Sequence, residues 1–500
     1  SCSKSIEPPL KCLYIFICIC KGKSLKECME ASVWKTKPFK HQAKAFDLGH
    51  EQKAYGYFME MGTGKTKVAI DNANFLYERK EINDVIVLAP NSVYTNWVKE
   101  IKNHSKLQPD IFIWKTHNLK KLDKYKYNKF FFLLMNIESL SRNKGVKFLK
   151  HQLLKRGDKT LLIVDESTTI KNKRAKRTQE LCKIGYLAKY RRILTGSPVT
   201  KNPLDLYTQC EFLSKDLLGF KSYYAFRNRY AILKEINLGT HSTKIPVKFI
   251  NTEELEQKLK LFSFRCTKED CLDLPPKQHF IRNIELSEEQ KKIYTRLKRE
   301  ARAIIYDKEV SYTNKLTEII KLHQVTCGFT KTDTEDIVQF KTNPKLKELE
   351  SILEETTGKS IIWANYIFNI KQIEKMLEKN YGKESLVSIY GAVSVDNRKR
   401  AVENFQNNSG CRFLVGNPSV GGFGLTLTAA RNVIYFSNSY NLEHRDQSED
   451  RAHRIGQTFK VSYIDLVAPN TIDELILNSL DGKRDLSKEI MGDNIKRYFD

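Results

Sequence analysis

Acidic residues are scarce in this sequence relative to basic ones. The 85 lysines and arginines outnumber the 59 aspartates and glutamates, and the formal net charge is +26 at pH 7. Such a balance favours a polyanionic partner, with nucleic acid first among the candidates. A genome rich in A and T also raises the lysine content without any function, so the excess alone does not place positive charge in a cleft.

Apolar runs of bilayer length are absent. The run at residues 13–20 follows a basic start, but it is far too short to span a bilayer. No small-residue cleavage pattern of a secretory signal follows it. We expect a buried strand or an unstructured leader there, and no membrane partner.

Cysteine pairs at metal-binding spacing are nearly absent as well. Five of the eleven cysteines fall within the first 28 residues, and the other six are scattered singly. This distribution is typical of reduced thiols in an intracellular protein and argues against a disulfide framework. Cys18 and Cys20 are close enough for zinc, but no second pair follows at the usual spacing. The role of this segment stays open.

The sequence does contain two similar halves, in which short apolar, β-branched runs alternate with helical patterns. The runs lie at residues 55–59, 85–89, 131–135, 161–164 and 192–194, and again at 361–364, 386–389, 412–415, 432–436 and 461–466. Runs of this length, separated by helices, predict parallel sheets buried on both faces. The expected fold class is therefore α/β, with two parallel-sheet lobes.

Polar helical patterns separate the two halves, and the pair Pro275-Pro276 interrupts them. We interpret them as two helical excursions, one attached to each lobe. The expected division is a leader at 1–30, lobe 1 at 31–214, a helical insertion and junction at 215–275, a helical excursion of lobe 2 at 276–345, lobe 2 at 346–480 and a C-terminal tail at 481–500.

A glycine-rich turn at residues 60–64 follows the first apolar run and leads into a helical pattern. Backbone N–H groups in such a turn, together with a helix N-terminus, bind phosphate oxygens. Lys65 is placed to reach the β- and γ-phosphates of a nucleotide, and the Thr66 hydroxyl to bind Mg²⁺. Met59 stands where the general pattern has glycine, but the strand-turn-helix context favours a phosphate loop over a chance turn. The expected nucleotide contacts are Met61, Gly62, Thr63, Gly64, Lys65 and Thr66.

Two carboxylates, Asp165 and Glu166, end another apolar run about a hundred residues later. Because parallel strands end at the same edge of a sheet, this pair is expected to face the phosphate loop. We expect Asp165 to hold Mg²⁺, and Glu166 to orient and deprotonate the attacking water. An acidic pair after a strand is often only a helix cap, but its spacing from the phosphate loop favours catalysis.

Arg451 and Arg454 lie three residues apart, just after an acidic turn. One helical face would carry both, and such a pair suits arginine fingers that meet charge on a transferring phosphoryl group. A nucleotide shared with the phosphate loop would then lie between two domains, and its hydrolysis can move them. The alternative is a surface helix whose arginines pair with Glu449 and Asp450.

Gln42 precedes the phosphate loop by about twenty residues. Its amide can both donate to and accept from an adenine edge, which favours ATP, although a polar residue at a helix start is the plain alternative. Two basic segments, 115–129 and 171–192, are candidate nucleic-acid surfaces or simply solvated faces. Base-specific readout is not expected, because no recognition helix or zinc-finger spacing appears.

Taken in order, these motifs resemble those of the SWI/SNF-type ATPases of helicase superfamily two, over nearly all of residues 37–480. The segments that carry the likeness are 85–92 with Asn96 and Trp97, 165–172, 194–203, 265–277, 421–430 and 450–457. The last of them, Asp-Arg-Ala-His-Arg-Ile-Gly-Gln, is the most family-specific. The resemblance implies two RecA-like lobes that use ATP and Mg²⁺ to track along double-stranded DNA, largely independently of sequence.

The resemblance also assigns contacts that the residues alone do not. Ser167 and Thr168 replace the family's alanine and histidine, so a hydrogen-bond relay to Thr195 would have to use hydroxyl groups. Gly422 is expected at the nucleotide, and the expected DNA contacts are Pro90, Asn91, Lys171, Asn172, Gly391 and Gly421.

Short inserts fit a minimal bacterial, phage or viral motor better than a large chromatin remodeller. We therefore expect a cytoplasmic location, or a nuclear one in a eukaryote. Two other functions stay open: a strand-separating helicase or restriction-system motor subunit, and a non-enzymatic, nucleotide-gated DNA clamp. The lack of a wedge insertion or nuclease motif counts against the first, and the intact set of catalytic candidates counts against the second. The sequence does not indicate the pathway, the direction of movement, the oligomeric state or any protein partner.

Overall fold

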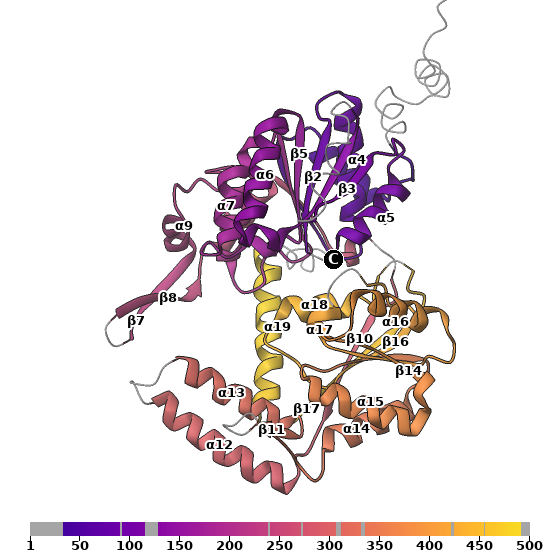
Figure 1. The fold of residues 1–500 in the computed structure, drawn as a ribbon. Helices are drawn as coiled ribbons and strands as arrows, with labels where there is room; N and C mark the ends of the chain where they lie inside the picture. The colour runs from indigo at the N-terminus through magenta and orange to yellow at the C-terminus, as the bar shows by residue number, and fades with distance from the viewer. Residues whose placement is uncertain are drawn as a thin grey trace, which may run out of the picture.

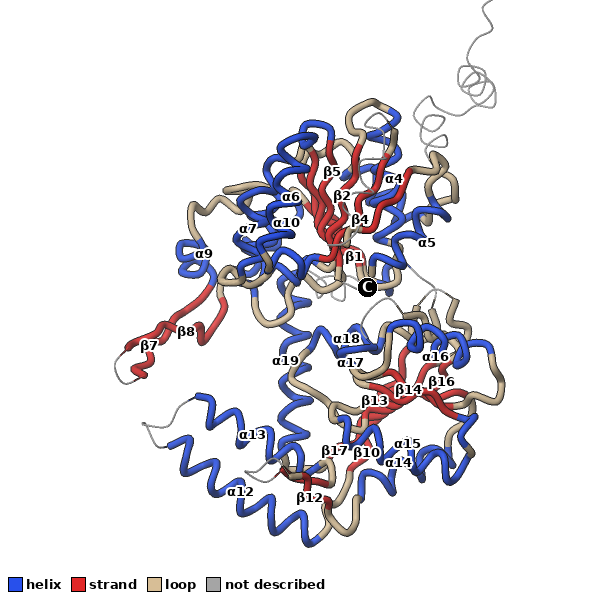
Figure 2. The backbone as a smooth tube through the Cα atoms, in the orientation of Figure 1, coloured by secondary structure: helices blue, strands red, loops and turns tan. Residues whose placement is uncertain are grey.

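The computed structural model describes residues 34–90, 93–115, 129–238, 241–271, 274–306, 312–331, 336–421, 425–454 and 456–491. The predicted leader at 1–30, Asn91 and Gly422 lie outside the described residues. Two lobes are stacked, with the N-terminal half above and the C-terminal half below in Figure 1. Each lobe has a sheet at its centre and helices around it (Figure 2).

Lobe 1 is built on a seven-stranded sheet whose strands pair in parallel throughout, as the apolar runs predicted. Its central strand β5 is apolar up to its last residue and buried along its whole length. Leu162 and Val164 pack into one apolar cluster, whereas Leu161 and Ile163 pack into another on the opposite face. In spatial order the strands are β3 (Asp110–Ile113), β4 (Phe131–Asn136), β2 (Asp84–Ala89), β5 (Thr160–Asp165), β6 (Tyr190–Leu194), β1 (Ala54–Met59) and β9 (Ser263–Cys266).

Helices cover both faces of this sheet and connect its strands by crossovers. They are α3 (Lys40–Gly49), α4 (Lys65–Glu78), α5 (Tyr94–His104), α6 (Asn143–Arg156), α7 (Lys176–Ile184), α8 (Leu206–Leu213), α9 (Tyr223–Tyr230), α10 (Thr252–Lys260) and α11 (Lys268–Cys271).

Lobe 2 repeats the plan with a six-stranded, fully parallel sheet. In spatial order the strands are β10 (Lys277–Asn283), β17 (Val461–Val467), β16 (Ala430–Tyr435), β13 (Lys359–Trp363), β15 (Phe413–Gly416) and β14 (Leu386–Ile389). The helices are α12 (Glu288–Tyr306), α13 (Tyr312–Thr326), α14 (Pro344–Glu355), α15 (Ile367–Tyr381), α16 (Val395–Asn407), α17 (Pro418–Gly421), α18 (Leu442–Glu449) and α19 (Ile472–Met491). The two-lobed α/β fold predicted from the sequence is confirmed.

The two segments between the lobes are less helical than the sequence patterns indicated. The predicted helical insertion at 215–275 contains an antiparallel hairpin, β7 (Ala231–Leu238) with β8 (His241–Phe249), and it ends in β9 of the lobe 1 sheet. The hairpin projects from lobe 1 beside α9 (Figure 1). The predicted helical excursion at 276–345 begins with β10, an edge strand of the lobe 2 sheet, and also holds the short hairpin of β11 (Phe329–Lys331) and β12 (Ile337–Gln339). These strands carry mixed polar and apolar side chains, so no continuous apolar run marked them.

The last helix, α19, contacts both lobes. It begins after β17 in lobe 2, runs upward as the yellow helix in Figure 1, and contacts α10 of lobe 1. Leu486 near its end packs against the apolar core of lobe 1. The predicted boundary at residue 481 therefore falls inside a helix. Among the described residues, no helix is both long and apolar enough to cross a bilayer.

A buried histidine joins the α12–α13 excursion to the body of lobe 2. His323 on α13 bonds through Nδ1 to the hydroxyl of Tyr366 at 2.9 Å, and its Nε2 lies 3.7 Å from a carboxylate oxygen of Asp473. Asp473 is itself paired with Lys345 at 2.7 Å. Burial lowers the pKa of His323 to about 4, although Asp473 opposes the shift.

We predict that acid destabilises lobe 2 through this histidine. The folded chain holds the imidazole neutral, so between about pH 6.5 and 4 only the unfolded chain binds the proton, and stability falls as pH falls through that window. The expected loss is roughly 2 kcal/mol by pH 5. In thermal unfolding, the difference in Tm between pH 7.5 and 5.5 should shrink in His323→Gln. An unchanged difference would show that other groups carry the acid sensitivity.

Candidate active site

The turn after β1 has the geometry of a phosphate loop. Gly62 and Gly64 have φ angles of +83° and +92°, a region that favours glycine, and α4 starts directly after them at Lys65. The Lys65 ammonium donates to the backbone carbonyl of Glu60 at 3.3 Å, and the Thr63 hydroxyl donates to the same carbonyl at 2.7 Å. The Lys65 ammonium is therefore bonded to the loop itself. The backbone N–H groups at the start of α4 are placed to meet phosphate oxygens.

Gln42 supports this loop from behind. Its side-chain N–H donates to the carbonyl of Thr63 at 3.0 Å, and its amide oxygen accepts from the backbone N–H of Phe39 at 3.1 Å. A Cβ placed on Gly64 would lie 2.1 Å from the Gln42 amide nitrogen. The buried Gln42 amide thus packs tightly against Gly64. Hydrogen bonds from this amide to an adenine edge stay a prediction.

The acidic pair lies at the end of β5, beside β6 and close to β1 in the sheet. Asp165 is buried, and its two oxygens accept from the indole N–H of Trp97 at 2.8 Å and from the backbone N–H of Glu166 at 2.9 Å. Burial raises the pKa of Asp165, and the bond from Trp97 opposes that shift. Trp97 belongs to α5 and is fully buried, so the carboxylate is held in one orientation.

Glu166 has a left-handed backbone, with φ of +49°, which turns the chain sharply out of the strand. Burial, then the neighbouring Asp165, raises the pKa of Glu166 to about 7, while Lys65 opposes the shift. Conversely, burial lowers the pKa of Lys65, and Glu166 and Asp165 raise it. The lysine and both carboxylates therefore form one electrostatic cluster at the carboxyl edge of the sheet.

Hydroxyl groups connect this acidic pair to the turn after β6. The Ser167 hydroxyl donates to the Gln209 side chain at 2.7 Å, and Gln209 donates onward to the carbonyl of Pro198 at 2.8 Å. The Thr195 hydroxyl accepts from the backbone N–H of Ser197 at 3.2 Å within the same turn. The hydrogen bonds from Ser167 thus pass through Gln209 on α8, which the sequence patterns did not mark, and end at Pro198; the relay to Thr195 stays a prediction.

The second hydroxyl, on Thr168, reaches the other lobe. It donates to a carboxylate oxygen of Glu443 on α18 at 2.9 Å. Lys171 pairs with the other oxygen of Glu443 at 3.1 Å and donates to Thr200 at 2.6 Å. The segment after Glu166 is therefore bonded directly to lobe 2.

The prediction that one helical face carries Arg451 and Arg454 is wrong: α18 ends at Glu449, and both arginines lie in the turn that follows it, against the phosphate loop of lobe 1. A Cβ placed on Gly62 would lie 3.1 Å from the Cβ of Arg454, so the two turns are packed together. Burial, then Arg454, lowers the pKa of Arg451 to about 10, while Glu166 raises it. Both guanidinium groups donate to the carbonyl of Leu425, at 3.4 Å from Arg451 and 3.1 Å from Arg454. Residues from both lobes thus meet at one phosphate-binding turn.

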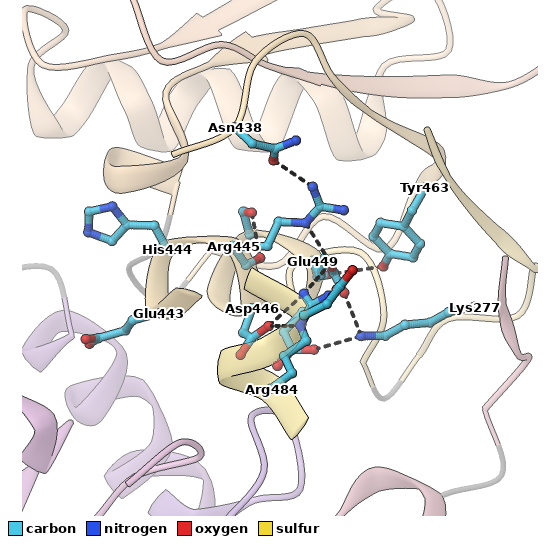
Figure 3. A network of polar contacts seen from close by, with 12 residues as sticks. Lys277, Asn438, Glu443, His444, Arg445, Asp446, Glu449, Tyr463 and Arg484 are labelled. Atoms are coloured by element: carbon cyan, nitrogen blue, oxygen red, sulfur yellow. Dashed lines mark hydrogen bonds and ion pairs between the residues drawn. The ribbon is translucent and has the colours of Figure 1, made fainter. Parts of the chain in front are cut away.

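A buried ion network fixes the helix that precedes these arginines (Figure 3). Arg445 on α18 makes a bidentate contact with Asp465 at 2.5 and 2.8 Å and also bonds Glu449 at 2.7 Å. Arg484 on α19 bonds both Asp446 and Glu449 at 2.8 Å. Burial alone raises the pKa of Glu449, but Arg484, Lys277 and Arg445 hold it well below its usual range. Glu449 pairs with Arg445 and Arg484, and Asp450 pairs with Lys268, so the acidic end of α18 is buried and not exposed.

Comparison with known proteins identifies this arrangement. The SNF2-related domain family matches residues 50–341, and the helicase conserved C-terminal domain matches residues 344–456. The chain belongs to the SNF2-related family. It is an ATP-dependent helicase-like ATPase of superfamily two, as the sequence motifs predicted.

Similar proteins come from bacteria, archaea and eukaryotes. An uncharacterized ATP-dependent helicase of Mycoplasma genitalium, MG018, is 27% identical over 446 residues, which cover 88% of this chain and 40% of that protein. The putative ATP-dependent helicase/translocase YwqA of Bacillus subtilis is 26% identical over 450 residues, covering 86% of this chain and 46% of that protein. The SWI2/SNF2 ATPase core of Sulfolobus solfataricus, solved with double-stranded DNA, has a TM-score of 0.42 and 26% identity, covering 91% of this chain and 93% of that one. The chain spans less than half the length of the two bacterial relatives.

The predicted DNA contacts of this SNF2-related ATPase lie mainly at the ends of sheet strands. Pro90 follows β2 and is buried, whereas Gly391 follows β14 and is exposed. Asn172 accepts from the backbone N–H of Arg174 at 2.9 Å and shapes a turn. Lys171 forms an ion pair with Glu443, and Gly421 is the last residue of α17. No contact with DNA tests these residues, and their roles stay predictions.

Several residues of the ATPase site carry no local signal in the sequence. Trp97 and Gln209 act at sequence separations of 68 and 42 residues from their partners. Lys268, in the junction segment, bonds Asp450 of lobe 2 at 2.5 Å. Only the family motifs pointed to Trp97 and Lys268, and they assigned neither a role.

We predict that Gly64→Ala weakens ATP binding about tenfold or more. The new Cβ would displace Gln42 from Thr63, and the left-handed backbone costs an alanine roughly 1–3 kcal/mol. Titration with a fluorescent ATP analogue measures the effect. Gly482→Ala on α19 is the matched control, because its Cβ would meet no atom within 4 Å. Unchanged affinity in Gly64→Ala would mean that the loop tolerates a shift of Gln42.

Proposed function

We propose that this ATPase is a motor that binds double-stranded DNA and translocates along it. ATP binds in the cleft between the lobes and closes them, and hydrolysis opens them again. The observation that carries the proposal is the packing of Arg454 against Gly62 across the cleft. A nucleotide bound at the phosphate loop would be contacted from both lobes, so its presence and loss would change how the lobes meet.

The donor set at the phosphate loop suits Mg²⁺. Thr66 lies in the first turn of α4, and Asp165 ends β5 at the same edge of the sheet. A hydroxyl and a carboxylate are the hard oxygen ligands that Mg²⁺ takes beside nucleotide phosphates. Bound there, the ion would neutralise phosphate charge. Trp97 leaves Asp165 an oriented carboxylate for that purpose.

The chain's own groups would then carry out the hydrolysis. Glu166, with a pKa near 7, is suited to accept a proton from the attacking water. Lys65 would leave the Glu60 carbonyl for the phosphates. Arg451 and Arg454 would exchange the Leu425 carbonyl for the γ-phosphoryl group, where negative charge develops.

Positive charge supports DNA as the track. The net charge is +26, and the turn after the acidic pair exposes Arg174 and Lys176 beside Lys173, whose ammonium lies over Tyr223 at 3.9 Å. Contacts from lysine and arginine to backbone phosphates do not depend on sequence. One relative, YwqA, is described as a helicase/translocase. The two lobes would bind the DNA backbone in turn as the nucleotide state changes. Each cycle of ATP hydrolysis would then move the motor one step along the duplex.

We predict that Glu166→Gln keeps ATP binding but lowers kcat about a hundredfold or more, because the amide cannot accept the proton of the water. Lys65→Ala should weaken binding and turnover together, since the ammonium meets the phosphates in both states. Binding and steady-state hydrolysis distinguish the two. Glu354→Gln, an exposed residue on α14, is the control. Wild-type turnover in Glu166→Gln would refute its role as general base.

Duplex DNA should stimulate ATP hydrolysis well above single-stranded DNA or RNA, with little sequence preference. Affinity should fall steeply with salt as phosphate-bound counterions are released. A translocating motor should also displace the third strand of a triplex without unwinding a blunt duplex. Unwinding of the duplex with no triplex displacement would contradict the proposal.

One structural feature favours strand separation as the second candidate. The hairpin β7–β8 projects from lobe 1, although none is present in the described part of residues 421–457 in lobe 2 (Figure 1). Ile232, Ile245 and Val247 are exposed on it, beside Lys234 and Lys244. An apolar, basic hairpin can act as a wedge at a fork. Unwinding of forked duplex that is lost when residues 233–247 are replaced by a glycine turn would establish this second function.

A further inference from the structure

Lys268 is a buried lysine of lobe 1 whose ammonium group forms an ion pair with a carboxylate of lobe 2. It begins α11, two residues after the last strand of the lobe 1 sheet ends. Its ammonium donates to a carboxylate oxygen of Asp450 at 2.5 Å and to the backbone carbonyl of His453 at 2.6 Å. The Lys268 side chain is 4% exposed and that of Asp450 is 7% exposed. The bond therefore joins the two lobes through side chains that are buried from water.

The backbone of Lys268 is tied to the phosphate loop. Its N–H donates to the side chain of Glu60 at 2.8 Å, and the N–H of Glu60 donates to the carbonyl of Cys266 at 2.9 Å. Glu60 in turn supplies the carbonyl that holds Lys65 and Thr63. Glu60 is therefore bonded both to the backbone of Lys268 and to that of Cys266, two residues before it.

The two partners of Lys268 in lobe 2 flank the arginines. Asp450 directly precedes Arg451, and His453 directly precedes Arg454. His453 also shares a hydrogen bond of 2.8 Å with the carbonyl of Pro275 in the junction between lobes. The Lys268 ammonium therefore holds the turn through the Asp450 carboxylate and the His453 carbonyl, at the residues that directly precede the two arginines.

We propose that Lys268 is a positioning residue for ATP hydrolysis, which sets the turn of Arg451 and Arg454 against the phosphate loop. Closure of the lobes and arrival of the arginines at the γ-phosphate then become one event. The inference rests on the proposed role of these arginines at the nucleotide. A buried Lys–Asp pair is rarely needed for stability alone, because apolar replacements are often as stable. Its value here is geometric, since small misplacements of catalytic groups cost large factors in rate.

Lobe 2 offers a matched control in Lys345, which is equally buried and pairs with Asp473 at 2.7 Å away from the cleft. Lys268→Met should lower kcat about tenfold or more and change the affinity for a fluorescent ATP analogue less than threefold. Lys345→Met should lower the thermal midpoint without a comparable loss of kcat. Lys268→Arg should recover part of the rate, because it keeps the charge at the two acceptors.

A double-mutant cycle with Arg451 and Arg454 distinguishes a positioning role of Lys268 from a general loss of activity. In the Arg451→Ala/Arg454→Ala background, Lys268→Met should reduce the remaining turnover less than twofold, because its effect passes through the missing groups. Lys277 lies 3.6 Å from the same Asp450 oxygen and remains in Lys268→Met. If this partner does not suffice and the protein unfolds, Lys268→Met/Asp450→Asn removes the link and the carboxylate charge together, with Lys345→Met/Asp473→Asn as its control.

Three results would overturn the inference: full kcat in a folded Lys268→Met, equal losses in the Lys345 control, or losses that multiply in the arginine-free background. The proposed function fails differently. If Arg451→Ala/Arg454→Ala keeps wild-type turnover, the arginines do not act on ATP and both proposals are wrong. If that variant is inactive while Lys268→Met is not, only the role of Lys268 is wrong.

Discussion

The packing of one turn of lobe 2 against the phosphate loop of lobe 1 is the contact on which the rest of the structure depends. Gly62 has no side chain, and Arg454 fills the space where one would lie. That approach brings the guanidinium group of Arg451 within the electrostatic reach of Glu166. Burial dominates both shifts, but Arg451 lowers the pKa of Glu166, and Glu166 raises the pKa of Arg451. Under the proposed roles, neither lobe alone contains all the residues that hydrolysis needs.

Buried polar contacts hold the two sides of that cleft in register. On the lobe 2 side, Arg445 and Arg484 bond Glu449 and hold α18 in place (Figure 3). Arg484 belongs to α19, a helix that also contacts lobe 1. Across the cleft, Thr168 meets Glu443, and Lys268 meets Asp450. Charges buried in this way need exact partners, since each one left unpaired is costly. The lobes are therefore expected to meet in a few discrete arrangements, which is what a stepping motor requires.

Much of the fold could be predicted because burial on both faces forces nearly continuous apolar strands. The run at β5 is such a case, and the acidic pair at its end was placed correctly beside the phosphate loop. The edge strand β10 and the hairpin strand β7 escaped prediction, because both mix charged with apolar residues. Contacts such as Trp97 with Asp165 escaped for another reason: they join side chains from distant elements, and no local pattern records them. The roles assigned to the site residues remain predictions, whereas the family of helicase-like ATPases is confirmed.

A structure of the chain bound to Mg²⁺, ADP, aluminium fluoride and duplex DNA tests the shared site most directly. We expect the nucleotide in the cleft, with the guanidinium groups of Arg451 and Arg454 moved from the Leu425 carbonyl to the fluoride ligands that mimic the γ-phosphoryl group. Lys268 should still bridge Glu60 to Asp450 in that state. A nucleotide contacted by lobe 1 alone, with both arginines still bonded to Leu425, would contradict the account.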